Sequence, residues 1–302
     1  MKQDPTDKIM FITEPDAVML EVSEILTRLG YRSIITVISG IYQDVCKIFK
    51  GEFGGFRASN TPYHDFDHTA GVFLTSARLI HGAKLTGKGL SETETMRALI
   101  AAMFHDTGYL QTAEDTDGTG AKYGSQHEAR SVTFVRNYLT GKKMPETAVS
   151  DCVTMIACTK LSVTPAMLKF RSPGIAQAAN IVATADLLAQ IADRLYLEKL
   201  LLLYKESVDS GAPMFKSERD LLEKTEYFYY AIAKKRIEHD LGNVANTLRL
   251  HFKDRWDIDR DLYHDNIKKN MGYLKQIIIE SGDHYRDHLK RGNIVKEMKG
   301  SK

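Results

Sequence analysis

The segment ALIAAMFHD, residues 98–106, has the pattern of an apolar helix that ends in two polar groups. An uninterrupted apolar run leaves no polar stripe for solvent, so we predict a buried helix over residues 92–105, with Ser91 as its N-cap. His105 and Asp106 stand at the end of that helix, where the chain can turn and bring neighbouring side chains together. A buried aspartate without a partner is costly, and a cation removes that cost. The segment therefore predicts a helical core that carries metal ligands into its interior.

Most of the chain shares this helical spacing, with apolar residues recurring every three or four positions. Strand-like alternation of β-branched residues is nearly absent. Ser172 and Pro173 offer an N-cap followed by proline at the first helical position, and Ser125 offers another cap. We predict an all-α fold with helices over residues 16–29, 32–49, 68–83, 125–139, 145–158, 174 to about 206, 218–239, 243–252 and 257–279.

A single helical domain is expected over residues 1–302, with a metal-binding core at about 60–200 and a C-terminal helical extension at about 213–302. Residues 112–124 are polar and contain glycine, so they are expected to form a loop at the rim of a site. Residues 284–302 are rich in Lys and Arg and are expected to form a solvated tail. The histidines of the C-terminal part are expected at the surface, and they are His239, His251, His264, His284 and His288.

Charge and cysteine content narrow the function classes. Lys and Arg number 41 and Asp and Glu number 39, a balance that does not predict nucleic-acid or membrane binding. The three cysteines are widely spaced and form no C-x-x-C pair, which indicates a reduced, intracellular protein. The N-terminus has no long apolar stretch, so no signal peptide is predicted. No run approaches the roughly 18 apolar residues that span a bilayer, and a soluble cytoplasmic protein is expected.

A second cluster of polar groups lies at YHDFDH, residues 63–68. His64 and His68 are four positions apart and share a face if that segment is helical. Asp186 lies in the apolar run 181–188, whose hydrophobic neighbours favour burial over an N-cap or a surface charge. Histidine and aspartate in such a set can hold a divalent cation, and a cation can activate water. The alternative for each single histidine is a hydrogen-bonded polar residue without a ligand role.

The order His68, then His105 and Asp106, then Asp186 resembles the H…HD…D signature of the HD superfamily of metal-dependent phosphohydrolases. The resemblance covers about residues 60–200. It implies an all-helical fold, a centre of one or two divalent ions (Mn, Mg, Fe, Zn or Ni) and hydrolysis of a phosphate ester. By that resemblance, these four residues become the metal ligands.

Three segments have a finer resemblance to the catalytic domain of cyclic-nucleotide phosphodiesterases. YHD at 63–65 is similar to their Tyr-His-Asn motif, IACTKLS at 156–162 to their A-T-D-M-S segment, and ADL at 185–187 to the segment of their last ligand. By this resemblance His64 becomes the proton donor to the leaving oxygen, a role that suits an imidazole with a near-neutral pKa. His127 falls where many family members place a further histidine, which makes it a candidate for a second metal or for the phosphate.

Departures from the phosphodiesterase pattern limit what it implies. Tyr109 stands where the H-D-x-x-H motif has its second histidine, so binding of a single ion remains open. The chain has no evident counterpart of the C-terminal glutamine that recognises purine, and nucleobase specificity does not carry over. Arg130 and Lys160 could neutralise the substrate phosphate, with surface solvation as the alternative. Gln190 and Asp193 could contact the metal ligands or form a polar seam.

The sequence favours a metal-dependent phosphohydrolase that acts on a small phosphomonoester, nucleotide or cyclic nucleotide. One alternative is a di-iron oxygenase of the HD type, which would need more histidine ligands than can be placed. The other is a non-catalytic helical module that binds a nucleotide or a partner protein. A small phosphorylated substrate is the expected partner, while membranes and nucleic acids are not expected. The C-terminal helices at 218–279 could pair with a second copy of the chain to form a homo-oligomer.

Overall fold

The protein is all-α in the computed structural model, which describes residues 6–280 and 282–300. Within those residues the only β pairing is an isolated antiparallel bridge between Phe56 and Thr112, so the predicted fold class is confirmed. The α-helices are α1 (Asp7–Met10), α2 (Pro15–Leu29), α3 (Ile35–Phe49), α4 (Phe66–Leu85), α5 (Glu92–Phe104), α6 (His127–Gly141), α7 (Glu146–Ala157), α8 (Pro173–Ile191), α9 (Tyr196–Asp209), α10 (Glu218–Tyr227), α11 (Leu248–Trp256), α12 (Leu262–Glu280) and α13 (Ile294–Gly300).

Short sequence signals set where the central helices begin. Ser91 and Glu94 form a reciprocal capping box at the start of α5, which satisfies backbone N–H groups that a helix start leaves open. The Ser172 hydroxyl accepts a hydrogen bond from the N–H three residues later, and Pro173 occupies the first position of α8. Both predicted helix starts are confirmed.

The predicted cap at Ser125 is wrong, because a short 3₁₀ helix, Gly120–Tyr123, precedes it. The N–H of Gln126 bonds to the carbonyl of Tyr123 at 2.8 Å. The turn therefore extends past Ser125, and α6 begins at His127 with Gln126 as its N-cap.

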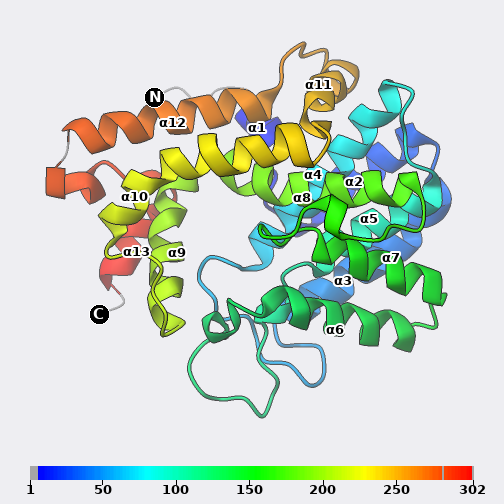
Figure 1. The fold of residues 1–302 in the computed structure, drawn as a ribbon, viewed down its shortest axis with the longest axis horizontal. Helices are drawn as coiled ribbons and strands as arrows, with labels where there is room; N and C mark the ends of the chain where they lie inside the picture. The colour runs from blue at the N-terminus through cyan, green and yellow to red at the C-terminus, as the bar shows by residue number, and fades with distance from the viewer. Residues whose placement is uncertain (1–5, 281, 301–302) are drawn as a thin grey trace.

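Figure 1 shows the helices in two groups, with α2 to α8 and α11 in one and α9, α10, α12 and α13 in the other. Within the first group α5 is buried on all sides, since the seven residues from Ala98 to Phe104 are all 0% exposed. The predicted buried helix is therefore confirmed. One apolar core continues from Met10 to Val295, so it includes side chains of both groups.

The helix predicted from residue 174 to about 206 is interrupted, and this part of the prediction is wrong. α8 ends at Ile191 and α9 starts at Tyr196, with a bend of 104° between them. The Asn270 side chain donates to the carbonyls of Ile191 and Asp193, so α12 supplies hydrogen bonds that a continuous helix would supply itself. Among the described residues no single helix is long and apolar enough to cross a bilayer, and only the bent pair α8 and α9 reaches that length and composition together.

Several residues between 284 and 298 pack against the other helices, so the predicted solvated tail is wrong at these positions, while residues 301 and 302 lie outside the described residues. Leu289 and Val295 are buried. Arg286 forms an ion pair with the carboxylate of Glu218 at the start of α10. The apolar residues at 289, 294 and 295 are surrounded in the sequence by charged residues, so the composition of the segment alone does not show that they are buried.

Residues 218–239 are helical as predicted, but α10 continues into wider π-helical turns at Phe228–Ala233 and Arg236–Asp240. Arg236 is buried, and its guanidinium donates to four carbonyls in the segment after α7, those of Cys158, Lys160, Leu161 and Val163. The C-terminal helices therefore hold the 158–163 segment in place.

Four of the five C-terminal histidines are exposed as predicted, but His251 is fully buried. α11 packs with this side chain towards His81 of α4, and their Nδ1 atoms lie 2.9 Å apart. Phe252 and Trp256 also contact the His251 ring. The prediction of a surface position for His251 is wrong because its partners lie far away in the sequence.

Candidate metal centre

Four side chains from three helices or their ends meet at one point, and they are the predicted ligands His68, His105, Asp106 and Asp186. The two histidine Nε2 atoms lie 3.3 Å apart. Asp106 Oδ2 lies 3.3 Å from His68 Nε2 and 3.1 Å from His105 Nε2. Asp186 Oδ1 lies 3.2 Å and 3.5 Å from the same two atoms. Each carboxylate therefore faces both histidine nitrogens, and the ligand atoms of His68, His105 and Asp106 all lie within 4.8 Å of one another.

Local structure explains how adjacent residues can serve one centre. His105 is the C-cap of α5 and still has helical φ and ψ, whereas Asp106 has left the helix with φ −110° and ψ 7°. This change of direction brings together two side chains that would point about 100° apart within a helix. On the other side, Asp65 caps α4 and accepts a hydrogen bond from the N–H of His68, which fixes the first turn that carries this ligand.

Hydrogen bonds orient the histidine rings. His105 Nδ1 lies 2.9 Å from the carbonyl of Ala102, and a carbonyl can only accept, so Nδ1 carries the proton. The lone pair of neutral His105 is then on Nε2, the atom that faces His68 and the two carboxylates. This is the arrangement by which proteins commonly orient a metal-binding histidine.

The cluster is strongly coupled by charge. Burial alone lowers the pKa of His68, but hydrogen bonds and charges from Asp106 and Asp186 outweigh it and raise the pKa to about 9. The pKa of His105 is raised well above its usual value by the same two carboxylates against burial. Burial raises the pKa of Asp106, yet the charge of His105 brings it well below its ordinary range. The two carboxylates therefore stabilise positive charge at this centre.

The donor set and spacing fit a divalent ion. Around an ion with bonds of about 2.0–2.2 Å, neighbouring ligand atoms lie roughly 2.8–3.6 Å apart, from octahedral to tetrahedral geometry. The distance between the two histidine nitrogens and the distances from each nitrogen to the two carboxylate oxygens, 3.1–3.5 Å, fall within that range. Two imidazole nitrogens and two carboxylate oxygens suit Zn, Fe, Mn or Ni. Apart from Asp186, which is partly accessible, these side chains are almost fully buried.

His64 lies beside this cluster and has a partner that the sequence did not predict. Glu206 of α9 contacts His64 Nδ1 through Oε1, while Oε2 accepts from the backbone N–H groups of Tyr63 and His64 at 3.1 and 3.3 Å. Burial lowers the pKa of His64, but the charge and hydrogen bond of Glu206 outweigh it and raise the pKa above its usual value. Glu206 is 4% exposed, and its only sequence signal is an acidic residue close to the apolar run LLLLY of residues 200–204.

His127 is placed near the cluster, and Tyr109 lies between it and His64. The Tyr109 ring stacks on His64 with 4.4 Å between ring centroids and on His127 with 4.5 Å. His127 Nδ1 donates to the carbonyl of Gly124 at 2.7 Å, and its Nε2 lies 3.7 Å from Asp106 Oδ1. The second oxygen of Asp106 and His127 Nε2 could thus share a further ion. Tyr109 therefore supplies a ring contact at the position where the H-D-x-x-H motif has its second histidine.

The two candidate phosphate-binding cations are placed differently. The Arg130 guanidinium donates to the carbonyls of Gly108 and Leu110 and covers the Tyr123 ring at 3.5 Å, so it serves the loop after α5. Lys160 lines a large cavity beside the cluster, and its Nζ lies 3.1 Å from Glu128 Oε2. Of the two, only Lys160 is at the cavity.

A cavity of about 770 Å³ opens onto the cluster, within the usual range of about 300–1,000 Å³ for small-molecule sites. Its inner end is lined by His64, Asp106, His127 and Asp186, and its outer wall is made by α9, the 214–215 segment and α10 with the turns that follow it. The arrangement can place a small molecule between a metal ion and a proton donor.

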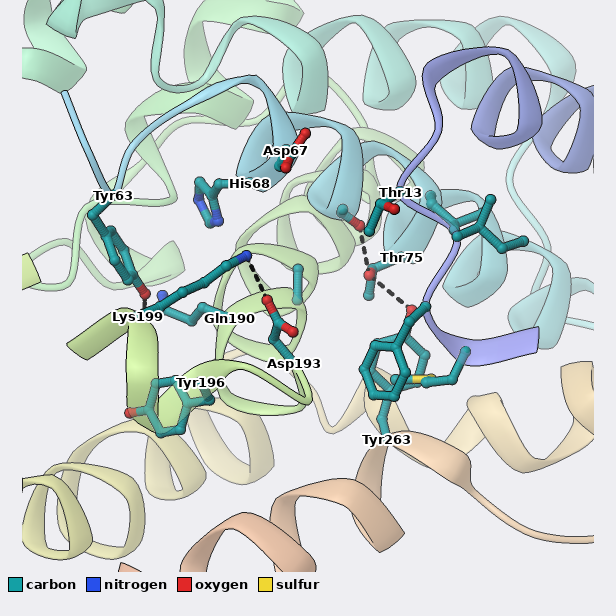
Figure 2. Close-up of a pocket in the computed structure, with 16 residues that line it drawn as sticks. Thr13, Tyr63, Asp67, His68, Thr75, Gln190, Asp193, Tyr196, Lys199 and Tyr263 are labelled. Carbon is teal, nitrogen blue, oxygen red and sulfur yellow. Dashed lines mark hydrogen bonds and ion pairs between the residues drawn. The ribbon is translucent and has the colours of Figure 1, made fainter. Parts of the chain in front are cut away.

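A smaller cavity of about 80 Å³ lies behind His68. Figure 2 shows Lys199 reaching across it to Asp193, with Tyr63 and His68 near one side. The Lys199 ammonium lies 2.6 Å from Asp193 Oδ2, and the Tyr63 hydroxyl donates to Gln190 Oε1 at 2.8 Å. Neither Gln190 nor Asp193 has a hydrogen bond to the four ligands, so both belong to the polar seam that was the alternative prediction.

No protein-family model matches the chain, and no curated protein is significantly similar to it. The assignment of a function therefore depends on the chemistry of this centre.

Proposed function

We propose that this protein is a metal-dependent phosphohydrolase that cleaves a phosphate ester in the large cavity. The observation that supports the proposal most strongly is that two histidine nitrogens lie 3.3 Å apart and that one carboxylate oxygen of Asp106 and one of Asp186 each lie within 3.1–3.5 Å of both nitrogens. Such a set is buried at the inner end of a cavity of about 770 Å³, where a substrate can reach it.

His68, His105, Asp106 and Asp186 would hold the ion. When bound, a divalent ion supplies Lewis acidity towards phosphoryl oxygens and lowers the pKa of water. Asp106 Oδ1 and His127 Nε2, 3.7 Å apart, would hold a second ion if the site takes two.

His64 is the proton donor in this proposal. Its Nδ1 is engaged by Glu206, which leaves Nε2 for the substrate, and the residue lines the cavity. Water adds to phosphorus and loses one proton to solvent while the bond from phosphorus to the leaving oxygen breaks. His64 gives its proton to that oxygen and regains one from solvent afterwards. Glu206 keeps the imidazole oriented and stabilises its protonated form, as carboxylates do for catalytic histidines elsewhere. The products are an alcohol or phenol and a phosphate with one ester bond fewer.

A metal-reconstitution assay tests the proposal. The purified protein is stripped with a chelator, reloaded separately with Mn²⁺, Mg²⁺, Fe²⁺, Zn²⁺ or Ni²⁺, and assayed with 4-nitrophenyl phosphate and bis(4-nitrophenyl) phosphate. We expect hydrolysis with at least one of these ions, loss of turnover after chelation and recovery after reloading. Mass spectrometry of the digested protein measures the bound metal in the same samples.

The double variant His105→Ala, Asp106→Ala is the test of site, and His239→Ala, at an exposed histidine outside the cavity, is its matched control. Turnover and bound metal should be lost in the double variant and retained in the control. A protein that binds no metal, or that binds metal and hydrolyses neither ester, would contradict the proposal. Undiminished turnover in the folded double variant would do so as well.

A further inference from the structure

The outer wall of the large cavity is apolar. It is lined by Leu200 and Leu203 of α9, Met214 and Phe215 of the connecting segment, and Leu221, Tyr227, Phe228 and Ile232 of α10 and its π-helical continuation. These side chains belong to the C-terminal helices, whereas the metal ligands come from α4, α5 and α8 or their ends. The cavity therefore has a polar inner end and an apolar outer half built by separate parts of the chain.

Three of these apolar side chains, and Leu161 of the segment after α7, remain open to solvent. The exposed fractions are 71% for Met214, 69% for Tyr227, 49% for Leu161 and 40% for Ile232, and all four line this cavity. Single exposed apolar residues are ordinary, but several gathered at one site mark a binding surface. Covering them with an apolar ligand group would remove that area from water, which is favourable.

The cations at the cavity are already paired with carboxylates. Lys160 Nζ lies 3.1 Å from Glu128 Oε2, and Lys224 Nζ lies 2.9 Å from Asp220 Oδ2. The third candidate, Arg130, does not line the cavity and bonds to backbone carbonyls. A chain of two or three phosphates needs several cationic groups. Beyond a bound ion, this cavity offers the protonated His64, which is paired with Glu206, and the two paired lysines.

The wall also has few groups that would read a nucleobase. The hydroxyls of Thr159 and Thr225 both donate to backbone carbonyls of their own segments, those of Ile156 and Leu221. The Gln190 side-chain oxygen accepts from the Tyr63 hydroxyl. Specific recognition of a base edge requires several polar groups placed for it. Besides Ser125 and Ser162, the cavity offers two threonine hydroxyls and a glutamine oxygen that are engaged within the protein.

We infer that the substrate is a phosphodiester of single negative charge with one bulky apolar ester group, alkyl or aryl, seated against this outer wall. The inference rests on the proposed function, because it takes the phosphoryl group to lie at the inner end of the cavity. The bulky ester group, whether it is retained or released, contacts the wall of α9 and α10. The metal centre and His64 act on the phosphorus. The volume of about 770 Å³ leaves room for a large organic group beside one phosphate.

The preference for an apolar ester group can be measured with a homologous series of diesters that share one leaving group. Methyl, butyl and octyl 4-nitrophenyl phosphate are compared with the 4-nitrophenyl ester of thymidine 5′-phosphate, all on metal-loaded protein. We expect kcat/KM to rise along the alkyl series, by up to about fourfold for each methylene that becomes buried. The octyl ester should exceed the thymidine ester by more than tenfold.

A charged substitution in the apolar wall tests whether this wall binds the alkyl group. Met214→Glu should lower the ratio of octyl to methyl kcat/KM at least tenfold, because the carboxylate would lose solvation beside the chain. Met167→Glu changes a residue that is 69% exposed but does not line the cavity, so the ratio should be unchanged.

The outcomes separate this inference from the proposed function. Hydrolysis of no ester, the methyl diester included, would overturn the proposed function. Equal kcat/KM across the alkyl series, or preference for the thymidine ester, would overturn the apolar substrate class and leave the hydrolase in place. A flat series together with a dimer that Met214→Glu dissociates in sedimentation would assign the apolar wall to a second copy of the chain and also overturn the inference.

Discussion

The histidine pair His68 and His105 differs from the pair His81 and His251, although both are buried inside the helical bundle. In the first pair the facing atoms are two Nε2 nitrogens at 3.3 Å, and carboxylate oxygens of Asp106 and Asp186 lie within 3.5 Å of both. In the second pair the facing atoms are two Nδ1 nitrogens at 2.9 Å. Burial and closeness are shared, so these two properties alone do not make a metal centre.

The carboxylates make the difference. Asp254 Oδ2, the acidic oxygen near the second pair, lies 3.5 Å from His81 Nε2, on the opposite edge of the ring from His251. Burial lowers the pKa of His81 and, with nearby arginines, brings the pKa of His251 well below its usual value. The first pair is poised to share positive charge, and the second is poised to stay neutral. A buried histidine pair becomes a candidate metal centre when acidic oxygens converge on its facing nitrogens.

Breaking each pair in turn should give the largest contrast. His105→Ala removes one ligand atom from the centre, and we expect turnover of an aryl phosphate ester to fall about 1,000-fold, which corresponds to roughly 4 kcal/mol of lost transition-state stabilisation. His251→Gln alters the other pair and should retain bound metal and turnover. Steady-state kinetics and metal analysis of both folded variants, checked by circular dichroism, measure this. Equal losses in the two variants would remove the distinction between the pairs.

Removing the carboxylate charges should convert the first pair towards the second. Asp106→Asn and Asp186→Asn keep the side-chain shape but replace an anionic ligand with a neutral amide. We expect metal affinity to fall by more than the roughly 10–100-fold typical of an outer-sphere partner, with the larger loss in Asp106→Asn, since its side chain is 5% exposed against 19% for Asp186. Competition with a chromogenic chelator gives the dissociation constants. Unchanged affinity in both variants would show that the carboxylates do not bind the ion.

Glu206→Gln sharpens the comparison at the proposed proton donor. Glu206 raises the pKa of His64 against the effect of burial, so the protonated donor should persist to higher pH in the wild-type protein. The variant should lose turnover about 10–100-fold, and the alkaline limb of its kcat profile should move to lower pH. Bound metal should be unchanged, because Glu206 contacts His64 and not the ligands. A profile that keeps its alkaline midpoint would contradict the role of Glu206.

Much of the fold could be predicted because its signals are local. Ser91 with Glu94, and Ser172 with Pro173, are neighbours in sequence and set the starts of α5 and α8. The apolar run that ends at His105 also predicts burial directly. The four ligand positions were inferred from motif order, and the structure brings them together. These elements depend on residues within a few positions of each other or on a pattern that survives in the sequence.

The features that could not be predicted depend on distant partners. The break after Ile191 is stabilised by Asn270 of α12, and Glu206 reaches His64 across 142 positions. His251 is buried against His81, 170 positions away. No local sequence pattern predicts such contacts, because the side chain of each of these residues could equally well lie at the surface. The apolar wall of the cavity was missed for the same reason, since its parts come from three separate segments.

The smallest expected effect is a pH dependence of stability at the second pair. The pKa of His251 is well below its usual value because of burial and the charges of Arg78, His81, Arg255 and Arg28, so the unfolded chain binds a proton more readily than the folded protein does. Its contribution to stability is complete above the unfolded pKa of about 6.5 and is lost as the pH falls below it. Acidification from pH 7.5 to 5.5 should therefore lower the free energy of unfolding through this histidine. Urea unfolding should therefore show a free energy of unfolding that falls less steeply with acidification in His251→Gln than in the wild type. Parallel curves would mean that His251 is not held neutral by its surroundings, and the contrast between the two pairs would then lie in geometry alone.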